Sequence, residues 1–289
     1  VGKSITEISC SYSAEGKFCA CAECSAIYQE EGSQAGVLVP FVNRIDTTLR
    51  EEYPGIRVIT NAYGDVRIPP KNVVLNDEIA LLYCWNGCAN HLIGGGECGE
   101  GGNSLGYSNT KEEAYYLGWT EHCSQIYVWY YPTNIYYLLC PQPNLANLYN
   151  DFIWFMEHKA TGFYVVGTTG SSFEDLDAYL ISRLIWDAGM TEEEYILRME
   201  EYLRAYYGPG WSYIYTYIQM LIEAGDEMGC VLNDFEHPFD IYSRAYFADH
   251  FDEMQSLFAQ ASASCETEQE RENIRRLSVI DHTRMTSCA

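Results

Sequence analysis

Three cysteines near the start of the chain form its clearest metal-like pattern. Cys19, Cys21 and Cys24 lie within six residues, and three thiolates could join one more ligand around a zinc ion in a closed structural site. The candidates for that fourth ligand are Cys84, Cys88 and His91. Only one CxxC pair is present, with no second pair at zinc-finger spacing, so a packed thiol cluster or a local disulfide is the alternative.

A glycine-rich stretch at residues 94–106 is not a phosphate-binding loop. It lacks the Lys-Ser/Thr ending of such a loop, and Glu97 and Glu100 would repel a phosphate. Two interpretations stay open, a mobile loop over a cleft and a surface insertion. No His-Glu-x-x-His sequence occurs either, so the zinc-protease motif is absent.

Composition limits the partners. Acidic residues outnumber basic ones 41 to 17, a net charge of −24, which repels phosphate backbones and anionic membranes, so we expect no nucleic-acid partner. The chain is 47% hydrophobic but has no run of roughly 20 apolar residues, so we expect no membrane insertion. With 12 cysteines and no visible signal peptide, the compartment, secreted or cytoplasmic, stays open, as does the oligomeric state.

Short β-rich runs alternate with helical runs, which predicts an α/β fold. The expected strands are residues 5–12, 56–63, 78–85, 125–130 and 162–167, and the expected helices are residues 37–52, 111–123, 144–158 and 173–186. Beyond residue 190 only helices are expected, and two are opened by the capping boxes Thr191 with Glu194 and Thr267 with Glu270. Five β-α units in series fit either part of an eight-unit barrel or a complete doubly wound sheet.

Several runs carry a family resemblance through their order and spacing. They are residues 18–24, 41–45, 61–63 with 69–71, 128–134, 141–145, 179–187 and 206–208. Over roughly residues 5–222 the chain resembles the bacterial family called domain of unknown function 4838, which is grouped with TIM-barrel glycoside hydrolases. The resemblance implies that residues 1–190 are the C-terminal part, about five β-α units, of a TIM-like (β/α)8 barrel. About three units would lie upstream of this sequence, and residues 191–289 would be a helical C-terminal region.

The same resemblance implies a carbohydrate-active protein that acts on glycosidic bonds of complex glycans. Its partner would be an oligosaccharide or polysaccharide, with no cofactor beyond the zinc ion considered above. Most glycosidases use two carboxylates. The family's acidic positions at the strand ends are neutral here, at Ala14, Asn86, Tyr130 and Val165. Glu15 and Asp65 remain as the candidate catalytic pair; the alternative is a non-catalytic glycan-binding barrel that has lost its catalytic carboxylates.

Aromatic residues gather at the expected strand ends, where their rings could pack against the apolar faces of sugars. The candidate substrate-binding residues are Tyr63, Trp85, Trp129, Tyr130 and Tyr131, with His91 and Asn134 at matching family positions as hydrogen-bonding partners. The alternative for the rings is packing in the protein interior, and for His91 a structural role.

Overall fold

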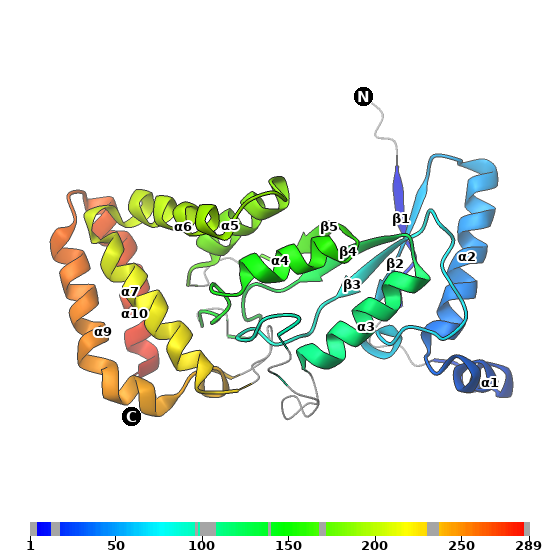
Figure 1. Ribbon diagram of the computed structural model, residues 1–289, viewed down its shortest axis with the longest axis horizontal. Coiled ribbons are helices and arrows are strands. Elements are labelled where there is room, and N and C mark those ends of the chain that lie inside the picture. The colour runs from blue at the N-terminus through cyan, green and yellow to red at the C-terminus, as the bar shows by residue number, and fades with distance from the viewer. Residues whose placement is uncertain are drawn as a thin grey trace. The chain divides into compact units, whose positions relative to one another are not determined.

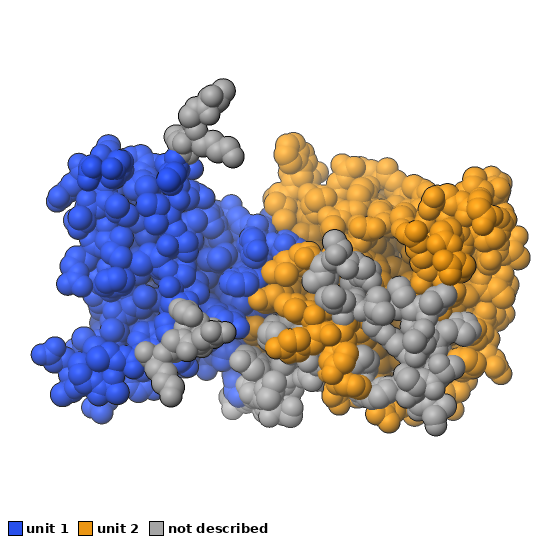
Figure 2. Space-filling model, turned by 180° about the vertical axis from the view of Figure 1, so that it is seen from behind, with its two compact units in different colours: residues 1–85, 111–130, 154–165 blue, residues 86–110, 131–153, 166–289 orange. Residues whose placement is uncertain are grey.

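The computed structural model (Figure 1) describes residues 5–12, 18–95, 98, 108–137, 140–167, 172–229 and 237–285. The chain forms two compact units that alternate along the sequence (Figure 2). Unit 1 comprises Val1–Trp85, Lys111–Tyr130 and Trp154–Val165, and unit 2 comprises Asn86–Thr110, Tyr131–Ile153 and Val166–Ala289. The domain boundary at residue 190 stays a prediction.

Unit 1 contains a five-stranded parallel sheet in the order β1-β2-β3-β4-β5. The strands are β1 (Glu7–Ser9), β2 (Arg57–Ala62), β3 (Ala80–Cys84), β4 (Gln125–Tyr130) and β5 (Ala160–Val165). All five expected strands are confirmed, and β1 is shorter than expected. A doubly wound sheet reverses its strand order at one point, whereas these strands lie side by side in the order of the sequence. The doubly wound alternative therefore does not fit them. Closure into a barrel stays a prediction.

The connecting helices follow the expected positions. They are α1 (Ala22–Glu31), α2 (Ala35–Glu52), α3 (Asn109–His122) and α4 (Leu148–Glu157), with the short 3₁₀ turn η1 (Gly64–Val66) between β2 and β3. Right-handed crossovers in a sequential parallel sheet place such helices on one face of the sheet. The α1 helix was not expected from the sequence.

Alternation along β4 gives this strand a covered and an open face, whereas four of the five residues of β3 are buried. In β4 the side chains of Ile126, Val128 and Tyr130 are buried, while those between them are partly exposed. On the covered face, aromatic rings from the strands meet rings from the helices, with Tyr83 and Tyr116 5.2 Å apart between centroids. The open face, which includes Trp129, is where a ligand could reach the sheet.

Unit 2 contains the remaining helices, grouped in Figure 1. They are α5 (Glu174–Trp186), α6 (Glu192–Tyr207), the 3₁₀ turn η2 (Gly208–Gly210), α7 (Trp211–Asp226), α8 (Pro238–Ile241), α9 (Arg244–Ser264) and α10 (Glu268–Met285). Both expected capping boxes are confirmed, and in the first Thr191 Oγ1 accepts a 3.2 Å hydrogen bond from Glu194 N. Among the described residues, no helix has the length and hydropathy needed to span a bilayer.

A glycine sets how closely α9 approaches the start of α7. A Cβ atom at Gly210 would lie 2.6 Å from the carbonyl oxygen of Ala261, closer than side-chain carbon atoms approach a backbone. Nearby, the rings of Tyr217 and Phe258 pack 4.8 Å apart between centroids. The break at residues 208–210 therefore ends α6 and also lets the helices of unit 2 pack.

Asp177, in the first turn of α5, is a buried carboxyl with a consequence for stability. It is 3% exposed, and among the described residues its Oδ1 atom has no hydrogen-bond partner. Burial, followed by the charge of Glu174, raises the pKa of Asp177 well above its ordinary value. The folded state therefore holds the proton more tightly than the unfolded chain. The resulting stabilisation is complete below the unfolded pKa of about 3.9 and is lost as the pH rises through the folded pKa.

We expect Asp177→Asn to raise the free energy of unfolding at pH 7 by more than about 1.4 kcal/mol, the equivalent of one pKa unit, because the neutral amide avoids the cost of burying a charge or holding a proton at that pH. That gain exceeds the roughly 0.3–1 kcal/mol that a carboxylate contributes at a helix N-terminus. The gain shrinks towards zero at about pH 3, below the unfolded pKa. Urea unfolding at both pH values measures it, with the exposed neighbour Asp175→Asn as the control. A destabilised Asp177→Asn variant at pH 7 would contradict the argument.

Candidate functional site

The carboxyl ends of the parallel strands bring together side chains from distant parts of the sequence. Barrel and open α/β proteins bind their ligands at this edge. Tyr63 follows β2 directly, and register pairs Cys84 at the end of β3 with Trp129 in β4. Trp129 in turn pairs with Tyr164 in β5. Three aromatic residues thus lie at the ends of β2, β4 and β5.

These three residues, Tyr63, Trp129 and Tyr164, form an aromatic row. The rings of Tyr63 and Trp129 are stacked, 6.0 Å apart between centroids and 21° from parallel. Tyr164 meets Trp129 edge to face at 5.5 Å. Tyr63 and Trp129 are partly exposed and Tyr164 is 56% exposed. The row is therefore a firmly packed apolar surface that a ligand can reach.

A polar group lies beside the row, at the end of β2. Tyr12 donates a 3.1 Å hydrogen bond from its hydroxyl to Asp65, which is exposed in η1. Asn61 fixes the backbone of Tyr12 on both sides, accepting from its N–H at 2.9 Å and donating to its carbonyl at 3.2 Å. Partial desolvation, the hydrogen bond to Asp65 and the Asp65 charge raise the pKa of Tyr12. Tyr12 therefore stays protonated and keeps donating to the Asp65 carboxylate.

The other candidate residues have different surroundings. Trp85 and Tyr130 are buried in unit 1, and Tyr131 and Asn134 are buried in unit 2. Asn134 accepts hydrogen bonds from the N–H groups of Tyr136 and Tyr137, at 3.0 and 2.8 Å, so its amide oxygen closes a turn. These four side chains are buried, whereas Tyr63 and Trp129 are partly exposed, and a role in substrate binding stays a prediction for all of them. Glu15 and Ala14 lie outside the described residues.

Sequence reasoning missed Tyr12 and Tyr164. A signal for Tyr164 exists, because it lies two residues after Gly162 on the same side of β5, and side chains two apart on a strand share a face. A Cβ atom at Gly162 would meet the ring of Tyr127 at 2.8 Å. The glycine therefore leaves room for the ring of Tyr127 on the side of β5 that it shares with Tyr164. No comparable signal points to Tyr12, which depends on the contact with Asp65.

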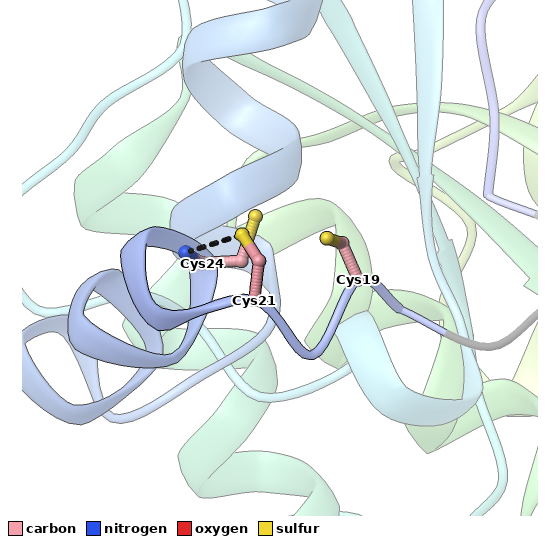
Figure 3. A group of neighbouring side chains, drawn as sticks. All are labelled: Cys19, Cys21 and Cys24. Carbon is pink, nitrogen blue, oxygen red and sulfur yellow. Dashed lines mark hydrogen bonds between the residues drawn. The ribbon is translucent and has the colours of Figure 1, made fainter.

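The three cysteines of the predicted zinc cluster do meet (Figure 3). The sulfur atoms of Cys19, Cys21 and Cys24 all lie within 4.8 Å of one another in unit 1. Cys21 is the N-cap residue of α1, and its sulfur accepts a 3.5 Å hydrogen bond from the N–H of Cys24. Three thiolates converging in this way fit the soft ligand set of zinc. A zinc ion at this cluster stays a prediction.

The surroundings of Cys21 and Cys24 shift the pKa values of their thiols in opposite directions. The N–H of Cys24, followed by the thiols of Cys19 and Cys24, lowers the pKa of Cys21. The hydrogen bonds with Cys21 and Cys19, followed by desolvation, raise the pKa of Cys24 to about 11. Because the thiolate is the reactive form, Cys21 is the better nucleophile near neutral pH.

We therefore expect iodoacetamide to alkylate Cys21 at least about tenfold faster than Cys24 at pH 7.5 in the metal-free, reduced protein. Tandem mass spectrometry of the peptide that holds both residues measures the two rates. The preference should shrink as the pH rises towards 11, because Cys24 then ionises as well. Faster labelling of Cys24 would contradict the assigned order.

Comparison with known proteins gives one match. A protein-family model described as "Domain of unknown function (DUF4838)" matches residues 2–219. Neither the comparison with curated proteins nor the comparison with solved structures finds a match to this chain.

Proposed function

Since the chain belongs to the DUF4838 family, which is grouped with TIM-barrel glycoside hydrolases, we propose that the protein binds glycans. The aromatic row of Tyr63, Trp129 and Tyr164 is the observation that supports the proposal. A row of rings at the carboxyl edge of a parallel sheet suits a ligand that alternates apolar CH faces with hydroxyl groups. Sugars have this character, because their ring faces pack on aromatic side chains while their hydroxyls seek polar partners.

Polar partners are available next to the row. Asp65 lies two residues after Tyr63 and can accept hydrogen bonds from sugar hydroxyls, and Tyr12 holds its carboxylate in place. Neither group favours a polyanion, and the net charge of −24 opposes one as well. We therefore expect a neutral glycan to bind more tightly than a uronic-acid polymer.

Binding of the full chain to a panel of plant and host glycans, measured by isothermal titration calorimetry, tests the proposal. We expect Tyr164→Ala to weaken binding by roughly twofold to tenfold, which corresponds to about 0.5–1.5 kcal/mol for one aromatic contact. Tyr53→Ala is the matched control, because Tyr53 is 53% exposed, close to the 56% of Tyr164, but lies at the end of α2. The proposal fails if no glycan binds, or if Tyr164→Ala binds as tightly as the parent.

Hydrolysis is the second candidate function, and the Tyr12–Asp65 hydrogen bond favours it. This bond fixes one carboxylate at the sheet edge, where a glycosidase needs two. Reducing-sugar release from the same panel distinguishes the two functions. Release that disappears in Asp65→Asn or Glu15→Gln would identify an enzyme with a rearranged carboxylate pair. Binding without release would identify a glycan-binding protein.

A further inference from the structure

Unit 2 contains a second group of metal-ligating side chains, formed by Cys88, His91 and Cys98. The sulfur atoms and one imidazole nitrogen all lie within 4.8 Å of one another. His91 Nδ1 is 3.2 Å from Cys88 Sγ and 3.1 Å from Cys98 Sγ. Cys88 is buried and the other two are partly exposed. Neither cysteine forms a disulfide. The Cys88 thiol donates a 2.7 Å hydrogen bond to Asn90 Oδ1, and it would give up this bond when it loses its proton to bind a metal ion.

Buried polar side chains hold the segment that carries Cys88 and His91. Asn109 accepts a 2.6 Å hydrogen bond from the N–H of Cys88 and donates to the carbonyl of His91 at 2.8 Å. Asp151 accepts from the N–H of Ile93 at 3.1 Å. Two ligands are thus fixed at the backbone by groups distant in sequence, which is the support that a preorganised metal site requires.

The distances suit a tetrahedral zinc ion. Zinc bonds of about 2.3 Å to sulfur and 2.0–2.1 Å to nitrogen imply sulfur–nitrogen separations of about 3.5 Å and sulfur–sulfur separations of about 3.8 Å. The contacts of 3.1 and 3.2 Å around His91 need only a few tenths of an ångström of expansion to reach that geometry. A set of two thiolates and one imidazole also suits zinc better than magnesium or calcium, which prefer oxygen ligands.

We propose that Cys88, His91 and Cys98 bind one Zn²⁺ ion. Among the described residues the group offers three ligands, and a tetrahedral zinc ion takes a fourth. The ion displaces the thiol protons and cross-links both ends of the segment from Cys88 to Cys98. Its binding energy therefore adds to the stability of this part of unit 2. This group and the aromatic row of the glycan site proposed above have no residue in common, so either proposal can fail without the other.

The test uses the full chain, reduced and treated with a chelator, and titrates it with Co²⁺ as a spectroscopic substitute for Zn²⁺. Because the cluster of Cys19, Cys21 and Cys24 could also bind metal, the parent for this test carries Cys19→Ser and Cys24→Ser. We expect one equivalent of Co²⁺ to bind, with a thiolate-to-cobalt charge-transfer band and the intense visible bands of tetrahedral cobalt. Zn²⁺ should displace it and raise the melting temperature.

In this background, Cys98→Ser and His91→Gln should each weaken Co²⁺ binding by at least tenfold and remove the zinc-dependent rise in melting temperature. Cys265→Ser, which removes a partly exposed thiol elsewhere in unit 2, is the matched control and should bind as the parent does. Circular dichroism of each variant without metal shows whether it folds. If Cys98→Ser does not fold, His91→Gln provides a second test, because it leaves both thiols in place.

Three results would overturn the proposal. One is the absence of cobalt binding in the Cys19→Ser, Cys24→Ser background, which would assign any metal to the other cluster. Another is unchanged binding in both Cys98→Ser and His91→Gln. The last is a Cys88–Cys98 disulfide in the protein purified without reductant, found by mass spectrometry, together with no metal binding after reduction.

Discussion

Replacing Glu112 by alanine should lower the free energy of unfolding by about 3–5 kcal/mol, because it leaves a largely buried charge without its partner. Glu112 is fully buried in the first turn of α3. Its Oε1 atom pairs with Arg67 Nη1 at 2.9 Å, and its Oε2 atom accepts a 2.9 Å hydrogen bond from the Tyr83 hydroxyl. The Glu112 carboxylate therefore links α3 to two other parts of the chain, Arg67 just after η1 and Tyr83 in β3.

The loss has two causes that add. The Arg67 side chain is only 18% exposed, so without Glu112 its guanidinium loses the charge that offsets its desolvation. The Tyr83 hydroxyl also loses an acceptor, and burial together with the Glu112 charge keeps that hydroxyl protonated by raising the pKa of Tyr83. Glu112→Gln should cost less than Glu112→Ala, because the amide oxygen can still accept from Tyr83.

Urea unfolding measures the effect. Glu121→Ala is the matched control, since it removes an exposed glutamate from the same helix and should change stability by no more than about 0.5 kcal/mol. A double variant, Glu112→Met with Arg67→Met, should recover much of the loss, because apolar side chains replace both charges at once. If Glu112→Ala unfolds at the parent's urea concentration, the buried pair does not stabilise the fold.

The strands could be predicted because their patterns are local. β3 is a nearly continuous apolar run, as a parallel strand buried on both faces requires. The α1 helix, which was not expected, lacks such a pattern. α1 carries scattered alanines, glutamates and cysteines without an apolar stripe, and Glu31 is its one buried side chain. α9 does have an apolar stripe, because its buried residues Met254, Leu257, Phe258 and Ala261 recur at helical spacing.

The candidate site could be predicted only in part, because sequence does not say which side of a strand faces the helices. Trp129 and Tyr130 are neighbours in β4 and were both candidates, yet successive side chains on a strand point to opposite faces. The fold places Tyr130 in the covered core and leaves Trp129 on the open face.

The thiol groups show a different limit of sequence reasoning. Cys88 and His91 were considered as a fourth ligand for the cluster at residues 19–24. Instead they meet Cys98 in a group of their own. Their spacing alone did not reveal this, because the segment with Cys88 and His91 is held by the side chain of Asn109, which is distant in the sequence.

Replacing Trp85 should cause the second large loss of stability. The same replacement tests whether Trp85 is a core residue or a sugar contact. Its side chain is fully buried and meets the ring of Phe155 edge to face, 5.1 Å apart between centroids. Tyr116 and Trp154 complete the surroundings, at 6.5 and 6.1 Å. Removing an indole from such a cluster leaves a cavity that the neighbours cannot fill.

We therefore expect Trp85→Ala to cost about 3–5 kcal/mol of unfolding free energy. Trp85→Phe should cost much less, because it keeps a ring and removes an indole N–H that has no hydrogen-bond partner among the described residues. If Trp85 is a core residue, Trp85→Phe binds glycan within about twofold of the parent, whereas Trp129→Phe, on the open face, weakens binding by roughly threefold or more. A Trp85→Phe variant that folds stably but loses glycan affinity would instead make Trp85 a ligand contact, and the covered face of the sheet would then have to open when glycan binds.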